Sequence, residues 1–264
     1  MEKTTKKEGF LKSLMRPSDL TTGKPWLVIL KYAAPIILSQ LLQQIYVLTD
    51  AAICGQVLSA EQVAGVNDTF PLTFMFLQFA FGCTGGFGVI TAARVGRSDE
   101  KGVRASFVTQ IYLSLIISAV LTALSVLTLP YMLRLINVTP DNAEVYSAAY
   151  DYCLIIFLGI VAQVGYNFVC GVLRAYGDSV TPLLFLIIST ALNVGLDLLF
   201  LIPLSMGPAG AAIATVLAQL ISFVACLVYT LIRYEKLRIR KEDWRVSGKD
   251  VAEHLKQGVP LGLQ

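Results

Sequence analysis

Long apolar blocks alternate with short polar segments along this chain. The apolar blocks cover residues 26–54, 63–93, about 105–129, about 146–172, 180–204 and 211–232. Each block reaches the ~20 residues that a membrane-spanning helix needs. None shows the ten-residue alternation of a transmembrane β-strand. The pattern therefore predicts an all-α integral membrane protein, with a six-transmembrane-helix bundle over residues 26–233.

Prolines and glycines refine these spans. Pro35 lies inside the first span and should bend that helix, because proline removes a backbone hydrogen bond. Pro130 is expected to end the third span. Residues 82–88 are rich in glycine and superficially resemble a phosphate-binding loop, but no strand precedes them and no Gly-Lys-Ser/Thr follows. We expect these small residues to allow close helix packing instead.

The charges indicate which end of each helix faces the cytoplasm. Hydrophobic residues make up 55% of the chain and charged residues only 15%, compared with roughly 25% charged in soluble domains. Of the 21 Lys and Arg residues, all but Arg134 fall on one side of the six-span topology. The positive-inside rule makes that side the cytoplasm, so both ends of the bundle are predicted to be cytoplasmic.

The segments outside the spans also carry information. Residues 1–25 are polar, contain no apolar stretch with a cleavage site, and are predicted to be a cytoplasmic tail. Residues 234–254 are predicted to be a basic cytoplasmic linker, with His254 exposed. Residues 255–264 resemble residues 30–38, since leucine, lysine and proline recur at the same spacing. We therefore predict that a second, parallel repeat begins at residue 255 and that the chain contains only its start.

Two aspartates lie deep inside apolar spans. Asp197 is the one charge between residues 180 and 204, and Asp50 lies in the outer part of the first span. A carboxylate inside the membrane costs at least ~2.5–3.5 kcal/mol, so such acids usually mark functional sites. Asn193 precedes Asp197 by one helical turn and shares its face. Thr215 can reach the same depth from the sixth span.

Two carboxylates close together do not both stay ionised cheaply, so one takes a proton or a cation lies between them. This coupling suits a carrier driven by protons or sodium. The alternative is that each aspartate forms structural hydrogen bonds between helices. Asp68 and Asp151 lie near the outer surface, where we expect solvated or capping roles. The five cysteines lack metal-site spacing and are expected to be buried free thiols.

The chain resembles the multidrug and toxic compound extrusion (MATE) transporters of the multidrug/oligosaccharidyl-lipid/polysaccharide exporter superfamily. The resemblance covers residues 24–264 and matches the amino-terminal half of a twelve-helix protein. It is carried by the segments Leu30-Lys31…Pro35 with Asp50, Gly82 to Gly96, Cys170 to Pro182, Asn193-Val194-Gly195-Leu196-Asp197 and Gly210 to Thr215.

This resemblance implies an antiporter that expels organic cations or drugs in exchange for sodium ions or protons. It implies no enzymatic activity, no further cofactor and no nucleic-acid partner. A bacterial plasma membrane is the expected location, with lipid around the helices. A second lobe is expected in the same chain or as a paired half. The implied cation or proton site comprises Asp50, Asn193, Asp197, Thr215 and, with less certain register, Asn167; sodium would bind Asp50, Asn193 and Asp197, and Pro35 would bend during transport.

Other readings stay open. A flippase for lipid-linked oligosaccharides belongs to the same superfamily, although its relatives tend to line the cavity with basic residues. An intramembrane aspartyl protease also uses two membrane aspartates. Its Gly-x-Gly-Asp motif is only loosely matched here, because Asn193 and Leu196 interrupt it. A half-length protein that works as a pair, or an inactive fragment, is a third reading.

Overall fold

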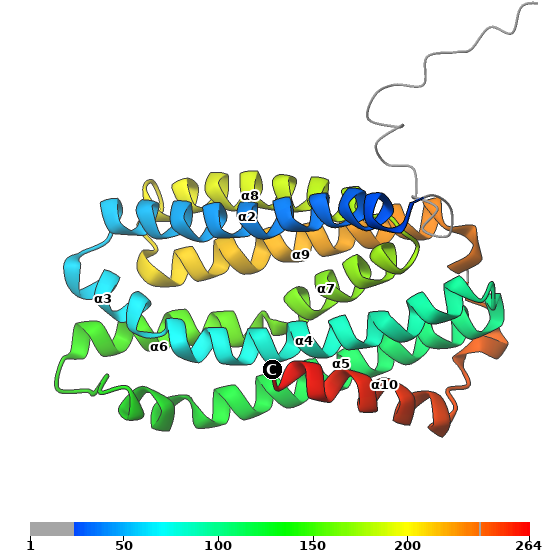
Figure 1. The fold of residues 1–264 in the computed structure, drawn as a ribbon. Coiled ribbons are helices and arrows are strands. Elements are labelled where there is room, and N and C mark those ends of the chain that lie inside the picture. Colours follow the sequence, from blue (N-terminus) through cyan, green and yellow to red (C-terminus); the bar gives the residue numbers. More distant parts are fainter. Residues whose placement is uncertain (1–23, 238) are drawn as a thin grey trace, which may run out of the picture.

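The computed structural model describes residues 24–237 and 239–264, and every regular element in that part of the chain is helical. The long helices lie side by side in one elongated bundle (Figure 1). The elements are α2 (Pro25–Val57), α3 (Ala60–Asp68), α4 (Phe70–Gly96), α5 (Glu100–Leu135), α6 (Ala143–Leu158), α7 (Ile160–Ala175), α8 (Val180–Leu201), α9 (Gly207–Arg233), the short helices η1 (Glu235–Leu237) and η2 (Lys241–Trp244), and α10 (Gly248–Gly262).

The membrane-spanning pattern is confirmed. Five candidate spans are long and apolar enough to cross a membrane, and α6 with α7 makes a sixth when the bent pair is counted as one. The connecting segments that carry most of the basic residues lie at one end of the bundle, here named the basic end (Figure 1). At this end the Tyr32 hydroxyl of α2 donates a hydrogen bond to the Arg174 carbonyl. Arg94 forms an ion pair with Asp250, and Arg104 forms one with Asp243. Which side of the membrane holds the basic end stays a prediction.

Two predicted spans are each divided into two helices. The second divides into α3 and α4 at Thr69, whose hydroxyl donates to the Val66 carbonyl at 2.6 Å, two residues before Pro71. The fourth divides into α6 and α7, which bend by 44° at Gly159. A Cβ atom at Gly159 would collide with the side chain of Val216. The glycine therefore lets α9 pack into the bend.

Pro130 and Pro35 both lie inside continuous helices. The third span does not end at Pro130, because α5 continues to Leu135. Only one backbone hydrogen bond is lost there, and the fully buried Leu129 and Leu133 hold the last turns against the core. α2 also runs without a break through Pro35, where the Ser39 hydroxyl donates to the Pro35 carbonyl at 2.8 Å. Bending at Pro35 stays a prediction.

The basic linker is shorter than predicted. Ser247 caps α10 through Lys249 N, so a helix crosses the expected boundary between residues 254 and 255. His254 is fully buried, which corrects the expectation that it is exposed. It lies on the same face of α10 as Gly258, one turn later, and this face packs against α4. The start of a second repeat at residue 255 stays a prediction.

α4 and α10 meet through four glycines, Gly82, Gly86, Gly258 and Gly262, here named the glycine seam. A Cβ atom at Gly86 would lie 2.5 Å from the Gly258 Cα atom, and one at Gly82 would overlap the backbone of Leu261. Two glycines four residues apart on each helix thus bring the backbones into contact, as in G-x-x-x-G pairs of membrane helices. The expectation of close packing around residues 82–88 is confirmed.

A polar cluster extends this contact toward the basic end. The His254 Nε2 atom lies 2.7 Å from the Ser106 hydroxyl of α5, and its Nδ1 atom lies 2.7 Å from the Asp250 carbonyl. Ser106 in turn contacts Thr91 of α4 at 2.8 Å. Because Nδ1 faces a carbonyl it carries the proton, and Nε2 accepts from Ser106 when the imidazole is neutral.

We predict that Gly86→Ala destabilises the chain while Gly85→Ala does not. The added methyl group at residue 86 forces two backbones apart, which costs about 1–3 kcal/mol. Nothing lies within 4 Å of a Cβ atom at Gly85, so alanine there gains helix propensity instead. Thermal unfolding of the purified variants in detergent measures the difference. Equal midpoints for the two variants would contradict the glycine seam.

We predict that docking of α10 weakens in acid. Burial lowers the pKa of His254 below its ordinary value of 6.5, with Arg94 adding to the decrease and Asp250 and Glu253 opposing it. The unfolded chain therefore binds more protons, so this stabilisation is complete above pH 6.5 and is lost as the pH falls below it. His254→Gln removes the titration. The midpoint of thermal unfolding should fall more for the parent than for His254→Gln between about pH 7.5 and about pH 5; parallel decreases would contradict the assignment.

Candidate cation and proton site

Four of the five predicted site residues come together near the end of the bundle opposite the basic end. Asp50 lies about two turns before the end of α2, Asp197 about one turn before the end of α8, and Thr215 about two turns after the start of α9. Asn193 and Asp197 share one face of α8 and are both fully buried. Three helices distant in the sequence therefore supply one polar cluster inside apolar surroundings.

Direct contacts connect these side chains. The carboxyl groups of Asp50 and Asp197 lie against each other, and Asn193 interacts with Asp50. The Asn193 Nδ2 atom donates to the Thr215 hydroxyl oxygen at 3.3 Å, and the Tyr46 hydroxyl donates to the same oxygen at 3.4 Å. Tyr46 precedes Asp50 by one turn on α2, so both reach the cluster from one helix face.

The cluster contains more acceptor atoms than donors. One oxygen of Asp50, both carboxylate oxygens of Asp197 and the amide oxygen of Asn193 are buried without a hydrogen-bond partner among the described residues. Burying such groups unpaired is costly. A proton shared between the carboxyl groups would relieve the cost, as would a hard cation that prefers oxygen ligands. The atoms present therefore fit either coupling ion.

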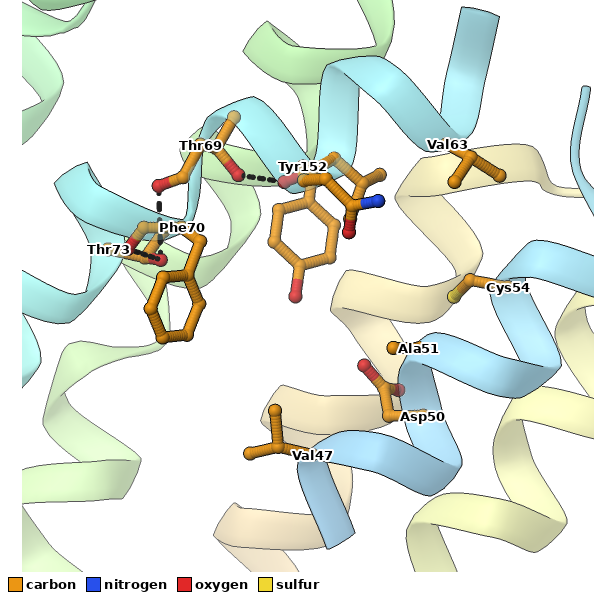
Figure 2. A pocket seen from close by; sticks show the side chains of 11 residues that line it. Val47, Asp50, Ala51, Cys54, Val63, Thr69, Phe70, Thr73 and Tyr152 are labelled. Carbon is orange, nitrogen blue, oxygen red and sulfur yellow. Dashed lines mark hydrogen bonds between the residues drawn. The ribbon is translucent and has the colours of Figure 1, made fainter. Parts of the chain in front are cut away.

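A small pocket reaches Asp50 from beside α2. It has a volume of about 90 Å³ and is bounded by side chains from α2, α3, α4 and α6. The Asp50 carboxyl and the Tyr152 hydroxyl point into the same space, with Thr69, Phe70 and Thr73 across from them (Figure 2). The remaining lining residues are Val47, Ala51, Cys54, Val63, Val66 and Asn67. A proton or small ion thus has space next to Asp50.

The structure also adds two tyrosines to the predicted site residues. Tyr46 bonds to Thr215, and Tyr152 faces Asp50 across the pocket. The sequence already places Tyr46 on one polar stripe of the first span, with Gln43 and Asp50 at spacings of three and four residues. Tyr152 lies in the fourth span, and only the packing of α6 against α3 and α9 brings it to the pocket beside Asp50.

Asn167 stands apart from the other predicted residues. No hydrogen bond joins it to the cluster within the described chain, and its Nδ2 atom is buried without a partner. Gln163, one turn earlier on α7, bonds to Gln219, which is one turn beyond Thr215 on α9. Asn167 therefore lies about two turns closer to the basic end than Thr215 does.

The remaining expectations about polar groups hold where they are described. Asp68 and Asp151 are exposed, and Asp151 accepts a 3.4 Å hydrogen bond from Ser147. All five cysteines are buried and free. No group of three or more His, Cys, Asp or Glu side chains in the described residues has the arrangement of a metal site. A cation at the cluster would therefore also need the oxygens of Asn193 or Thr215.

Comparison with known proteins identifies the family. The family model described as MatE matches residues 35–199, which include Asp50, Asn193 and Asp197. The chain belongs to the MatE family. It is 34% identical over 256 residues to the "Probable multidrug resistance protein YpnP" of Bacillus subtilis (strain 168), covering 95% of this chain and 55% of that protein. It is 25% identical over 244 residues to the "Probable multidrug resistance protein NorM" of Thermotoga maritima, covering 89% of this chain and 51% of that protein.

Solved MATE structures share the fold. The structure titled "Outward-facing conformation of a multidrug resistance MATE family transporter of the MOP superfamily" superposes with a TM-score of 0.83 at 25% identity, over 91% of this chain and 53% of that one. The chain thus spans about half the length of the relatives it matches. The all-α fold and the resemblance to one lobe of a MATE transporter are confirmed.

We predict that Thr215→Val destabilises the chain more than Thr190→Val does. Valine at residue 215 leaves Asn193 Nδ2 and the Tyr46 hydroxyl without their acceptor, a loss of about 1–3 kcal/mol. Thr190 lies on α8, and its hydroxyl only donates to the Leu186 carbonyl of its own helix, so it serves as the matched control. Thermal unfolding in detergent measures both. A Thr215→Val midpoint equal to that of Thr190→Val would show that these contacts contribute nothing.

Proposed function

We propose that this chain forms one lobe of a multi-pass exporter in a bacterial plasma membrane. The exporter would expel organic cations or drugs in exchange for protons or sodium ions moving inward. Asp50, Asn193, Asp197 and Thr215 would bind the coupling ion. A second lobe, in the same chain or as a paired half, would complete the path for the exported compound, which agrees with relatives about twice this length.

The unpartnered oxygens at the cluster are the observation that carries this proposal. An exporter that uses an ion gradient must change its own charge state when the ion binds. Asp50 and Asp197 lie together in a buried site, so binding of one cation or proton removes the repulsion between two carboxylates. Binding then changes the interaction between α2 and α8. Since α2 contacts the rest of the lobe chiefly through α8, this change can reorient the first helix.

The exported compound is proposed from the names of relatives, which are multidrug resistance proteins. The distribution of charge agrees with a cationic cargo. Apart from Arg134, the basic residues of the described chain lie toward the basic end of the helices, and the buried charge near the opposite end is acidic. A flippase for anionic lipid-linked sugars would need basic groups along its path, so this arrangement favours the exporter.

We predict that Asp50→Asn and Asp197→Asn each abolish coupled efflux. The gene's complete open reading frame would be expressed in cells stripped of their own exporters, and loss of ethidium from loaded cells would be followed by fluorescence. The initial rate should decrease by more than about tenfold, since each variant removes a charge whose binding of the ion drives transport. Asp151→Asn changes an exposed acid on α6 and should leave the rate unchanged.

Ion gradients imposed in the same assay identify the coupling ion. Stimulation of the parent by an inward sodium gradient at constant pH indicates sodium, and stimulation by an inward proton gradient without sodium indicates protons. If Asp50→Asn and Asp197→Asn reach the membrane in normal amounts and pump like the parent, the carboxyl pair is a structural contact and the proposed coupling site is wrong.

A further inference from the structure

Polar side chains on α7 and α9 continue from the acidic pair toward the basic end. α9 places Thr215, Gln219, Ser222 and Cys226 at intervals of three or four residues, so they share one face. α7 places Gln163, Asn167 and Cys170 in the same way. The two helices run in the same direction (Figure 1). Gln163 and Gln219 are hydrogen-bonded across the interface, and the Cys170 and Cys226 thiols lie in contact, a separation of 56 residues in each case. The two polar faces therefore meet level by level.

The first level below the acidic pair is a hydrogen-bonded trio. Gln219 Nε2 donates to Gln163 Oε1 at 2.5 Å, and the Ser189 hydroxyl donates to Gln219 Oε1 at 3.4 Å. Ser189 precedes Asn193 by one turn on α8, on the buried face that also carries Asp197. This trio thus lies directly beside the proposed ion site.

The second level holds two buried polar groups that have no partner. Asn167 is 6% exposed and Ser222 is 1% exposed, and neither Asn167 Nδ2 nor Ser222 Oγ forms a hydrogen bond with the described residues. They follow Gln163 and Gln219 by one turn on each helix. Polar groups buried inside a membrane protein require a polar partner, and buried water is the usual one.

The third level leads to the basic end. The thiols of Cys170 and Cys226 lie in contact. Beyond them Asp178 is 2% exposed and accepts hydrogen bonds from the Thr181 hydroxyl at 2.7 Å and from the Tyr234 hydroxyl at 3.0 Å. A second buried carboxyl group therefore ends the series, near the turn between α7 and α8.

We propose that these three levels, here named the polar column, hold water and carry protons between the Asp50–Asp197 pair and Asp178 at the basic end. This inference rests on the proposed function, and it selects the proton as the coupling ion. A chain of waters and side chains passes a proton by exchanging hydrogen bonds. A sodium ion would need to keep several oxygen ligands at every level, and the two thiols at the third level offer none.

The position of the ion site explains why such a route is needed. Asp50, Asp197 and Thr215 lie near the end of the helices opposite the basic end. A proton that enters there must still cross most of the membrane thickness to leave at the basic end. Polar groups inside a lipid-embedded lobe are expensive unless they have a function. The polar column spans this distance within the lobe.

Silver ion access tests the polar column. Ag⁺ is small, travels in water and binds thiols. The native Cys170 and Cys226 report on the third level, and Ser189→Cys reports on the level beside the ion site. Cys83 and Cys153 are the internal controls, because they are buried in apolar clusters as Cys170 and Cys226 are but lie outside the polar column. The chain would be exposed to Ag⁺ from the basic face in sided membrane vesicles. It would then be denatured, alkylated with N-ethylmaleimide, and each cysteine quantified by mass spectrometry.

We expect Ag⁺ to protect Cys170, Cys226 and the Ser189→Cys thiol, and to leave Cys83 and Cys153 free to alkylate. Ser222→Val should slow protection of the Ser189→Cys thiol by about tenfold or more, because it removes a water-binding group from the second level. Ser114→Val is the matched control, since Ser114 is also a buried serine without a partner but lies on α5 outside the polar column.

Any of three results would overturn the polar column. In the first, Cys170 and Cys226 react no faster than Cys83 and Cys153. In the second, the Ser189→Cys thiol is unreactive, so that no aqueous route leads from the basic end to the ion site. In the third, Ser222→Val and Ser114→Val slow its reaction equally, so that the second level plays no part in the route. The assay requires no transport. Failure of the polar column is therefore distinct from failure of the coupling site, which the efflux of the Asp50 and Asp197 variants tests.

Discussion

The lobe depends on burying two carboxyl groups together inside the membrane. The most apolar stretch of α2 contains no residue that is buried within the described lobe. Apolar packing alone therefore does little to define how this helix is rotated about its axis. Its polar face is defined instead by the Asp50–Asp197 contact and by the Tyr46 hydroxyl on Thr215. Rotation of α2 away from α8 and α9 would leave these groups facing lipid, which is far more costly than losing apolar contacts.

The same constraint explains the interior of the lobe. Besides the acidic cluster, hydrogen bonds between polar side chains connect helices at the glutamine and serine levels between α7, α8 and α9, and in the Thr91–Ser106–His254 cluster between α4, α5 and α10. Within the described chain each has partners from at least two helices. The helices are thus oriented by a few polar contacts, and the apolar core fills the space between them.

Much of this fold could be predicted from the sequence, because the membrane acts as the solvent. Its thickness sets the length of each apolar run, and it restricts basic residues to the ends of the spans. Asp50, Asn193, Asp197 and Thr215 could be placed at a similar depth by counting residues along helices. Counting gives depth and not neighbours, so Tyr152 opposite Asp50 and the distance of Asn167 from the cluster required the packed structure. The break at Gly159 depends on Val216, a residue of another helix.

His254 shows the same limit from the opposite direction. Its neighbours in the sequence are charged, which favours an exposed side chain, but the face of α10 that carries it is the glycine face that packs on α4. Local composition describes the average surroundings of a segment, whereas burial depends on which side of the helix meets a partner. The error at Pro130 arose similarly, because buried leucines on one face outweigh a single missing backbone hydrogen bond.

The glycine seam also determines how the molecule divides into units. By its sequence α10 resembles the beginning of a second repeat, but by its packing it belongs to the first lobe. A chain separated between residues 234 and 247 would leave the backbone of Gly82 and Gly86 facing lipid tails, whereas one separated after α10 would keep that surface covered. The predicted repeat unit and the unit that packs as a body therefore differ by one helix. Two such halves made separately would recognise each other best if the first retained α10.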